Sequence, residues 1–362
     1  MFTPETLNQL AGPDAKVVPT RDWPLVSLII PCRNEESFIS TCLDSLLAGE
    51  YPKNRLEILV VDGLSSDHTR AIVEGYARAY PFVQLLCNPM RTIPSAMNLG
   101  IERAKGDVLI KIDAHSSYPP GFVPSCVNAL RDYAADNVGG VLEIKAANDG
   151  LVARTIAAVL RHPFGSGNAL VKVGAAKPTE SDAVAFGCFP RTLFARIGMW
   201  NERLVGSSDM DINQRILQSG GKIFLLPTIC VRYYADAELQ SFWAHNFADG
   251  VWATYVMQFG SRAWAWRHWV PFLFVLSLTI SIGTALLVPA GRMLFFGVAV
   301  PYLIVCFGAS ASLAKRERDS RMLLSAPLAF GIRHIAHGMG ASYGLLLSLI
   351  PGLKWRGRRS AP

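Results

Sequence analysis

Two side chains able to bind a metal ion follow a short apolar segment at residues 108–112. The segment reads Val-Leu-Ile-Lys-Ile, which is typical of a buried β-strand, and Asp113 and His115 come directly after it. In an extended chain, residues two positions apart face the same side. A carboxylate and an imidazole at one strand end can ligate Mg²⁺ or Mn²⁺, and such a cation can bind a diphosphate. The alternative is a strand that leaves the core into a polar turn.

Two similar polar clusters stand earlier in the chain, each at the end of an apolar run. Residues 32–35 follow the first run, and Asp62 follows the second. The Asp62 carboxylate suits hydrogen bonds from a nucleobase or a ribose hydroxyl, and Asn34 and Glu35 suit the same nucleoside. An ordinary turn is the alternative for Asp62.

The apolar runs alternate with segments of helical spacing. We expect strands over 25–30, 56–61, 83–87 and 108–112, and helices over 36–47, 67–80 and 95–104. Strands alternating with helices of this length predict an α/β fold with a doubly wound, mainly parallel sheet. Ligands of such sheets bind beyond the carboxyl ends of the strands. The three polar clusters are therefore expected to meet at one edge of the sheet.

The pattern from residue 116 to residue 240 is less regular. We expect a glycine-rich loop over 161–168, a strand over 182–189 and a helix over 211–219. Asp209 and Asp211 stand where this helix begins, and either carboxylate suits a general base. The alternative is that both acids stabilise the helix start, where the dipole favours negative charge.

Two long apolar stretches, 270–290 and 293–314, dominate the rest of the chain. Each is long enough as a helix to cross a hydrocarbon core of roughly 30 Å. We therefore expect two transmembrane helices over 270–314, preceded by an amphipathic, aromatic-rich connector over 238–260. A third apolar segment, 322–350, is expected to be interfacial, re-entrant or spanning.

Composition excludes several classes of protein. Hydrophobic residues make up 51% of the chain and charged residues 17%, and the mean hydropathy is +0.26. Nine Lys or Arg residues against two acids in segment 315–362 account for the net charge of +7. This basic segment indicates a cytoplasmic anchor on anionic lipid, and no nucleic-acid partner is expected.

The cysteine spacing and the N-terminal segment both suggest that the domain before the apolar stretches lies in the cytosol. The seven cysteines are dispersed without a CxxC pair, which argues against a disulfide framework and fits a reducing compartment. Residues 1–23 form an N-terminal lead-in without the pattern of a signal peptide.

Together the motifs resemble a known family. PCRNEE at 31–36, VDGLSSDHT at 61–69 and the stretch 88–115 are similar to the inverting, nucleotide-sugar-dependent glycosyltransferases of family 2. HPFGSGNA at 162–169 and the stretch 185–223 resemble the subfamily typified by the succinoglycan biosynthesis protein ExoA.

The resemblance implies a fold and a division of the chain. The fold is of the GT-A type, a doubly wound, mainly parallel sheet followed by C-terminal transmembrane helices. The catalytic domain covers 24–260, with a nucleotide-binding half at 24–115 and an acceptor-binding half at 116–240.

The resemblance also implies roles for particular residues. Nucleotide-sugar binding falls to Pro31, Asn34, Glu35, Asp62, Arg91 and Asp113. Asp113 and His115 bind the divalent cation, and because most relatives carry a second Asp in place of His115, we expect Mn²⁺ to be preferred over Mg²⁺. Asp209 is the expected base, with Asp211 as the competing candidate.

On the acceptor side the resemblance points to Asn168, His245, Asn246 and Trp252. Processive synthases carry an Arg-Trp pair where this chain has Val251-Trp252, which favours a single transfer over polymerisation.

The predicted function is transfer of a sugar, with glucose as the candidate, from a UDP-sugar to a polyprenyl-diphosphate-linked saccharide in exopolysaccharide biosynthesis. We expect a multi-pass protein of the bacterial inner membrane, its catalytic domain in the cytoplasm, with membrane lipid and other exopolysaccharide assembly proteins as partners. The alternatives are a processive synthase and a non-catalytic membrane scaffold.

Overall fold

The computed structural model describes residues 23–259 and 266–350. The lead-in up to residue 22 and the basic residues from 354 onward, on which the sequence analysis placed an N-terminal segment and part of a cytoplasmic anchor, lie outside the described residues.

The first half of the chain forms the parallel part of a sheet. Strand β1 (Val26–Cys32) lies between β2 (Leu56–Asp62) and β4 (Val108–Lys111), and β3 (Val83–Cys87) pairs outside β2. All three pairings are parallel, with Cys32 opposite Asp62 at the carboxyl ends. The predicted alternation of strands and helices is therefore confirmed for this half.

Helices cover both faces of these strands, which explains why the strands are almost continuously apolar. Leu28 and Ile30 pack on the face covered by α2 (Ile39–Leu47), α3 (Thr69–Ala79) and α5 (Phe122–Asp132). Ile29 packs on the opposite face, against α4 (Ile93–Arg103) and α10 (Ser208–Gln218).

The second half extends the same sheet with reversed directions. The order is β3-β2-β1-β4-β7-β5-β8-β6, where β7 (Ala185–Pro190) is antiparallel to both β4 and β5 (Asn137–Lys145). Strand β8 (Ile223–Tyr234) pairs parallel to β5, and the two-residue β6 (Thr179–Glu180) is antiparallel to β8. The sheet is mixed and mainly parallel.

Several elements of this half differ from the expectation. The segment 161–168 was expected to be a loop, but Pro163–Ser166 forms helix α7, which Pro163 begins and Gly167 ends at φ 61°. Helix α10 begins at Ser208, three residues earlier than predicted, and therefore includes Asp209. Strands β5 and β8 and helix α5 were not predicted.

The other helices of this part of the chain are the 3₁₀ helices η1 (Lys53–Arg55) and η2 (Val256–Phe259) and the α-helices α6 (Leu151–Leu160), α8 (Leu170–Val173), α9 (Leu193–Ile197) and α11 (Leu239–Tyr255).

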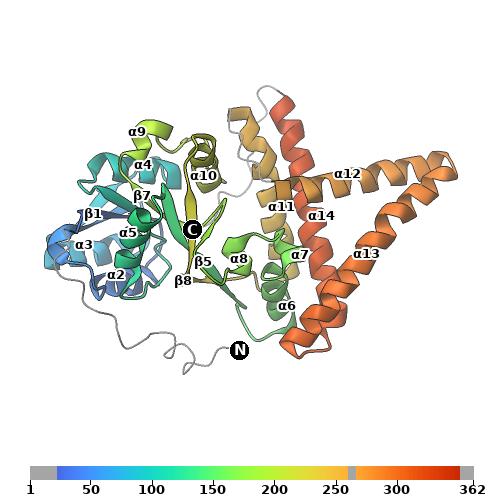
Figure 1. Cartoon of the computed structure of the whole chain (residues 1–362), viewed down its shortest axis with the longest axis horizontal. Helices are drawn as coiled ribbons and strands as arrows, with labels where there is room; N and C mark the ends of the chain where they lie inside the picture. Colours follow the sequence, from blue (N-terminus) through green and yellow to red (C-terminus); the bar gives the residue numbers. More distant parts are fainter. Residues whose placement is uncertain (1–22, 260–265, 351–362) are drawn as a thin grey trace.

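Two long helices extend away from the sheet and meet at their far end, so that together they form a hairpin (Figure 1). They are α12 (Trp266–Leu287) and α13 (Ala290–Glu317). Within the described residues, the segments Arg267–Leu287 and Ala290–Glu317 are long and apolar enough to cross a membrane. Their large apolar side chains are mostly exposed, as a lipid-facing surface requires.

The segment 322–350 forms one helix, α14 (Met322–Leu349), which runs side by side with α11 (Figure 1). Small residues bring the two backbones together. A Cβ atom on Gly340 would lie 2.1 Å from the Phe247 carbonyl oxygen, and one on Gly344 would lie 2.4 Å from that of Val251. Thr254 Oγ1 also donates a hydrogen bond of 2.8 Å to the Ala341 carbonyl. Helix α14 thus packs closely along α11.

This packing predicts opposite effects for two glycine substitutions in α14. Gly340→Ala should lower the free energy of unfolding by about 1–3 kcal/mol, because the added methyl group overlaps the Phe247 carbonyl. Gly331 has open space at the Cβ position, so Gly331→Ala should be neutral or stabilising by up to ~1 kcal/mol through helix propensity. Thermal unfolding of both variants in detergent tests this, and equal melting temperatures would contradict it.

Candidate active site

A cavity of about 120 Å³ opens at the carboxyl ends of the parallel strands. Five of the predicted nucleotide-sugar and metal residues line it: Pro31, Glu35, Arg91, Asp113 and His115. They come from the ends of β1 and β4 and from the loop that follows β3. The expectation that separate polar clusters meet at one sheet edge holds for these residues.

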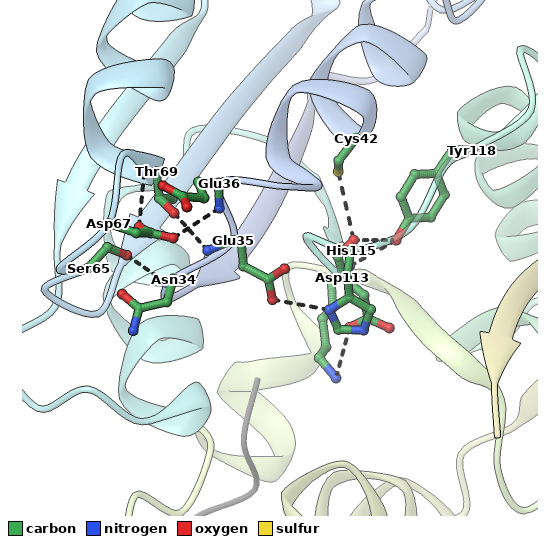
Figure 2. A network of polar contacts seen from close by, with 11 residues as sticks. Asn34, Glu35, Glu36, Cys42, Ser65, Asp67, Thr69, Asp113, His115 and Tyr118 are labelled. Carbon is green, nitrogen blue, oxygen red and sulfur yellow. Dashed lines mark hydrogen bonds and ion pairs between the residues drawn. The ribbon is translucent and has the colours of Figure 1, made fainter. Parts of the chain in front are cut away.

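Glu35 and His115, which both line this cavity, point toward one another (Figure 2). Glu35 Oε1 lies 3.2 Å from His115 Nδ1, and the Glu35 side chain is buried, whereas half of the His115 side chain is exposed. The hydrogen bond with Glu35 raises the pKa of His115, an effect that burial opposes and Asp113 reinforces. The imidazole is therefore held in place while one side stays open to a ligand.

Asp113 is fixed through its backbone, which leaves its carboxylate available (Figure 2). Its amide donates a hydrogen bond of 2.8 Å to the hydroxyl oxygen of Tyr118, a buried side chain. Strand β4 ends at Lys111, so Asp113 and His115 lie in the turn beyond the strand. They line the same cavity because of this turn, and not because of strand alternation.

Asn34 and Asp62, also predicted to bind the nucleoside, form hydrogen bonds with the loop that follows β2. The fully buried Asp62 carboxylate accepts a 2.5 Å hydrogen bond from Ser65 Oγ and lies 3.6 Å from Arg70 NH1. The Asn34 side-chain oxygen accepts a hydrogen bond of 2.8 Å from the Ser66 amide. Neither residue belongs to the cavity lining.

Lys111 was not predicted as a site residue, but its side chain contacts two of the predicted ones. Its side chain is 9% exposed, and its Nζ lies 2.5 Å from Asp209 Oδ2 and 3.9 Å from Asp113 Oδ1. Burial alone would lower the pKa of Lys111, but the carboxylates of Asp209 and Asp113 outweigh burial and raise that pKa above its ordinary value. The ammonium thus joins the candidate base to the candidate metal ligand.

The two acids at the start of α10 have different environments. The side chain of Asp209 is 54% exposed. Asp211 is buried, and its Oδ2 binds Arg215 through both Nε at 2.9 Å and NH2 at 2.8 Å. Asp209 is therefore the carboxylate that an external group can reach.

The side chains near Asp113 could bind a divalent cation only if a bound substrate supplied further ligands. Among the residues that the structure describes, no group of three or more His, Cys, Asp or Glu side chains is arranged to hold a metal ion alone. Asp113 and His115 offer two ligands, and Mg²⁺ is commonly bound by one or two protein ligands plus substrate phosphates. Such residues fit a cation that arrives with a diphosphate.

The predicted acceptor-side residues are spread over two regions. Asn168 lines a second, larger cavity beside α12 and α14. Asn246 is buried, and its side-chain oxygen accepts a hydrogen bond from Arg333 of α14. Trp252 packs over Gly206, where a Cβ atom would lie 2.5 Å from the indole ring. Asn246 and Trp252 therefore position α14 and the loop before α10.

His245 forms an acid–base cluster on α11. Its Nδ1 lies 3.3 Å from Asp236 and its Nε2 lies 3.8 Å from Asp249. The hydrogen bond to Asp236 raises the pKa of His245, although burial opposes the change.

This raised pKa predicts how the contribution of His245 to stability depends on pH. A raised folded-state pKa adds stability below the unfolded-state value of about 6.5, and the added stability is lost as pH rises through the folded-state value. The difference in melting temperature between the wild type and His245→Gln should therefore be larger at about pH 5.5 than at about pH 9. A difference that stays constant with pH would contradict the assignment.

Comparison with known proteins agrees with this geometry. The model of the family described as Glycosyl transferase family 2 matches residues 27–187. The dolichyl N-acetyl-alpha-D-glucosaminyl phosphate 3-beta-D-2,3-diacetamido-2,3-dideoxy-beta-D-glucuronosyltransferase of Methanococcus voltae is 24% identical over 302 residues, which cover 78% of this chain and 93% of that protein. The succinoglycan biosynthesis protein ExoA of Rhizobium meliloti is 27% identical over 225 residues, 62% of this chain and 67% of that protein.

Among solved structures, the mannosyltransferase PcManGT from Pyrobaculum calidifontis, in complex with GDP-Man and Mn²⁺, has a similar fold. The TM-score is 0.58 at 18% identity, over 91% of this chain and 90% of that chain. The predicted GT-A-type fold and the predicted family resemblance are both confirmed.

Proposed function

Since the chain belongs to glycosyl transferase family 2 through residues 27–187, we propose that it transfers a sugar from a nucleotide diphosphate donor to a lipid-linked saccharide, with inversion. One observation carries this proposal. The exposed carboxylate of Asp209 is held by Lys111 at the edge of the cavity that Glu35, Asp113 and His115 line.

The donor end of the proposal rests on the cavity at the carboxyl ends of β1 and β4. We assign Pro31, Glu35 and Arg91 to the nucleotide and its diphosphate, because they line this cavity. Asp113 and His115 would hold the divalent cation against the diphosphate. When bound, such a cation stabilises the charge of the departing nucleotide by Lewis-acid action. Lys111 and Arg91 also line this cavity and carry positive charge.

The acceptor end of the proposal rests on Asp209. Inversion by direct displacement requires a base that takes the proton from the acceptor hydroxyl as the new glycosidic bond forms. Asp209 suits this role because its side chain is half-exposed and its orientation is fixed by Lys111. Asp211 suits the role less well, because Arg215 occupies its buried carboxylate.

The relatives and the two long apolar helices support a membrane setting. The Methanococcus protein is named for a dolichyl-linked phosphate substrate and the Rhizobium protein for succinoglycan biosynthesis. We extend these to an acceptor on a polyprenyl phosphate or diphosphate and a role in exopolysaccharide assembly, at the cytoplasmic face of a bacterial inner membrane. A UDP-sugar, with glucose as the first candidate, is the donor we propose.

The assignment of the base is tested by two matched substitutions in α10. Asp209→Asn should lower sugar transfer at least about a hundredfold, because the base is lost, while the affinity for the nucleotide-sugar stays near the wild-type value. Asp211→Asn should mainly lower the melting temperature, because it removes the buried negative charge that pairs with Arg215. Transfer assays and donor titrations on membranes measure both. Retention of most of the transfer rate in Asp209→Asn would move the role to Asp211.

The metal assignment predicts a preference that one substitution reverses. An imidazole ligand favours Mn²⁺ over Mg²⁺ relative to a carboxylate, so the wild type should transfer faster with Mn²⁺. The variant His115→Asp should shift the preference toward Mg²⁺, and removal of divalent cations with EDTA should stop transfer in both proteins. A wild-type rate with Mg²⁺ equal to that with Mn²⁺ would overturn the role of His115.

A further inference from the structure

A second cavity, of about 520 Å³, lies where the sheet domain meets α12 and α14. Its wall combines two kinds of side chain. Lys172 of α8, Arg267 of α12 and Arg333 of α14 bring positive charge from three separate elements. Phe274 of α12 and Tyr302 of α13 contribute apolar surface from the two projecting helices. A cavity with this lining suits a ligand that has an anionic end and an apolar chain.

Two of the three cations already have partners. Arg267 forms an ion pair with Asp182. Arg333 Nε donates a hydrogen bond of 3.1 Å to the Gly165 carbonyl, and its NH1 lies 3.7 Å from Asp249 Oδ2. These contacts fix both guanidinium groups in the cavity wall.

Lys172 is the cation whose charge is left uncompensated. Within the described residues, its ammonium has neither a hydrogen bond nor an ion pair, although the side chain is half-buried. Burial, followed by the charge of Arg333, lowers the pKa of Lys172 to about 8, and Asp249 opposes this only partly. A bound anion would offset the repulsion between the Lys172 ammonium and the guanidinium of Arg333.

A second unsatisfied group lines the same cavity. His337 of α14 is 7% exposed, and its Nδ1 is buried without a hydrogen-bond partner among the described residues. A buried ring nitrogen without a partner is costly, so its presence indicates a missing ligand or water. Lys172 and His337 therefore point independently to a polar ligand.

The location of the cavity connects it to the catalytic residues. Ser207 and Met210, on either side of Asp209 in the sequence, are part of the lining. Val270 of α12 also lines the cavity. Further along the same helix, Leu273 and Ile280 are exposed apolar residues. The cavity thus extends from residues that flank the candidate base in the sequence to a helix that is apolar enough to cross a membrane.

We propose that this cavity binds the phosphate end of a polyprenyl-linked acceptor, with Lys172 as the principal phosphate ligand and the polyprenyl chain leaving along α12. The inference rests on the proposed transferase function, because it assigns the acceptor of that reaction. Arg267 and Arg333 supply the surrounding positive potential, and His337 Nδ1 supplies a further polar contact. Sugar residues attached to the phosphate then extend toward Asp209.

Binding can be measured apart from catalysis. The full-length protein is placed in phosphatidylcholine nanodiscs and titrated with undecaprenyl phosphate and, separately, with uncharged undecaprenol. The wild type should bind the phosphate at least about tenfold more tightly, as expected for a charge-assisted contact. Lys172→Met should remove about tenfold of this affinity, whereas Lys172→Arg should recover most of it.

A matched control is available on the same segment. Lys177 is exposed and is not part of the lining, so Lys177→Met should bind undecaprenyl phosphate as the wild type does. Equal binding by Lys172→Met and the wild type would overturn the proposal. Equal competition by phosphatidylglycerol at the same concentration would also overturn it, because the cavity would then be a general site for anionic lipid.

The binding and transfer measurements separate the two proposals. Selective binding that depends on Lys172, without sugar transfer from any nucleotide-sugar, would contradict the proposed function and leave the lipid site standing. Transfer with an unchanged acceptor KM in Lys172→Met would contradict the lipid site and leave the function standing.

Discussion

The buried ammonium of Lys111 sets the geometry of the candidate active site. An ammonium group can be buried only with a partner, because the cost of removing an isolated charge from water is several kcal/mol or more. Here the partners come from both parts of the domain, Asp113 from the turn after β4 and Asp209 from α10. The start of α10 is therefore held against the strand end that lines the smaller cavity. The candidate metal ligand Asp113 and the candidate base Asp209 thus share one ammonium group.

Helix α14 makes a similar connection between the sheet domain and the two projecting helices. It lies against α11 through Gly340 and Gly344, and a Cβ atom on Gly338 would lie 2.3 Å from the Pro271 carbonyl of α12. Arg333 of the same helix donates to the Gly165 carbonyl of the sheet domain. Contacts of α14 with both α12 and the sheet domain thus fix the position of α12 relative to the candidate site.

The sequence was most informative where one local pattern carries the structure. Parallel strands covered on both faces are apolar throughout, so β1 to β4 and the polar residues at their ends could be predicted from short windows. Lys111 could not be assigned in this way, since it reads as one polar residue in a strand and its partner Asp209 is 98 positions away. A strand over 182–189 was predicted, but no local pattern indicated that this strand, β7, runs antiparallel to β4. Helix α7 was missed because Gly165 within it and Gly167 at its end are typical of a loop.

The place of α14 in the chain has a consequence for biogenesis. Domains generally fold in the order in which they are synthesised, and all strands of the sheet precede residue 235. The two projecting helices come next, and α14 follows both of them. The larger cavity needs Arg333 and His337 from α14, so it is completed only after α12 and α13 have left the ribosome. A nascent chain can therefore form the smaller cavity before α12 and α13 are synthesised, whereas the larger cavity can form only after α14 has been synthesised.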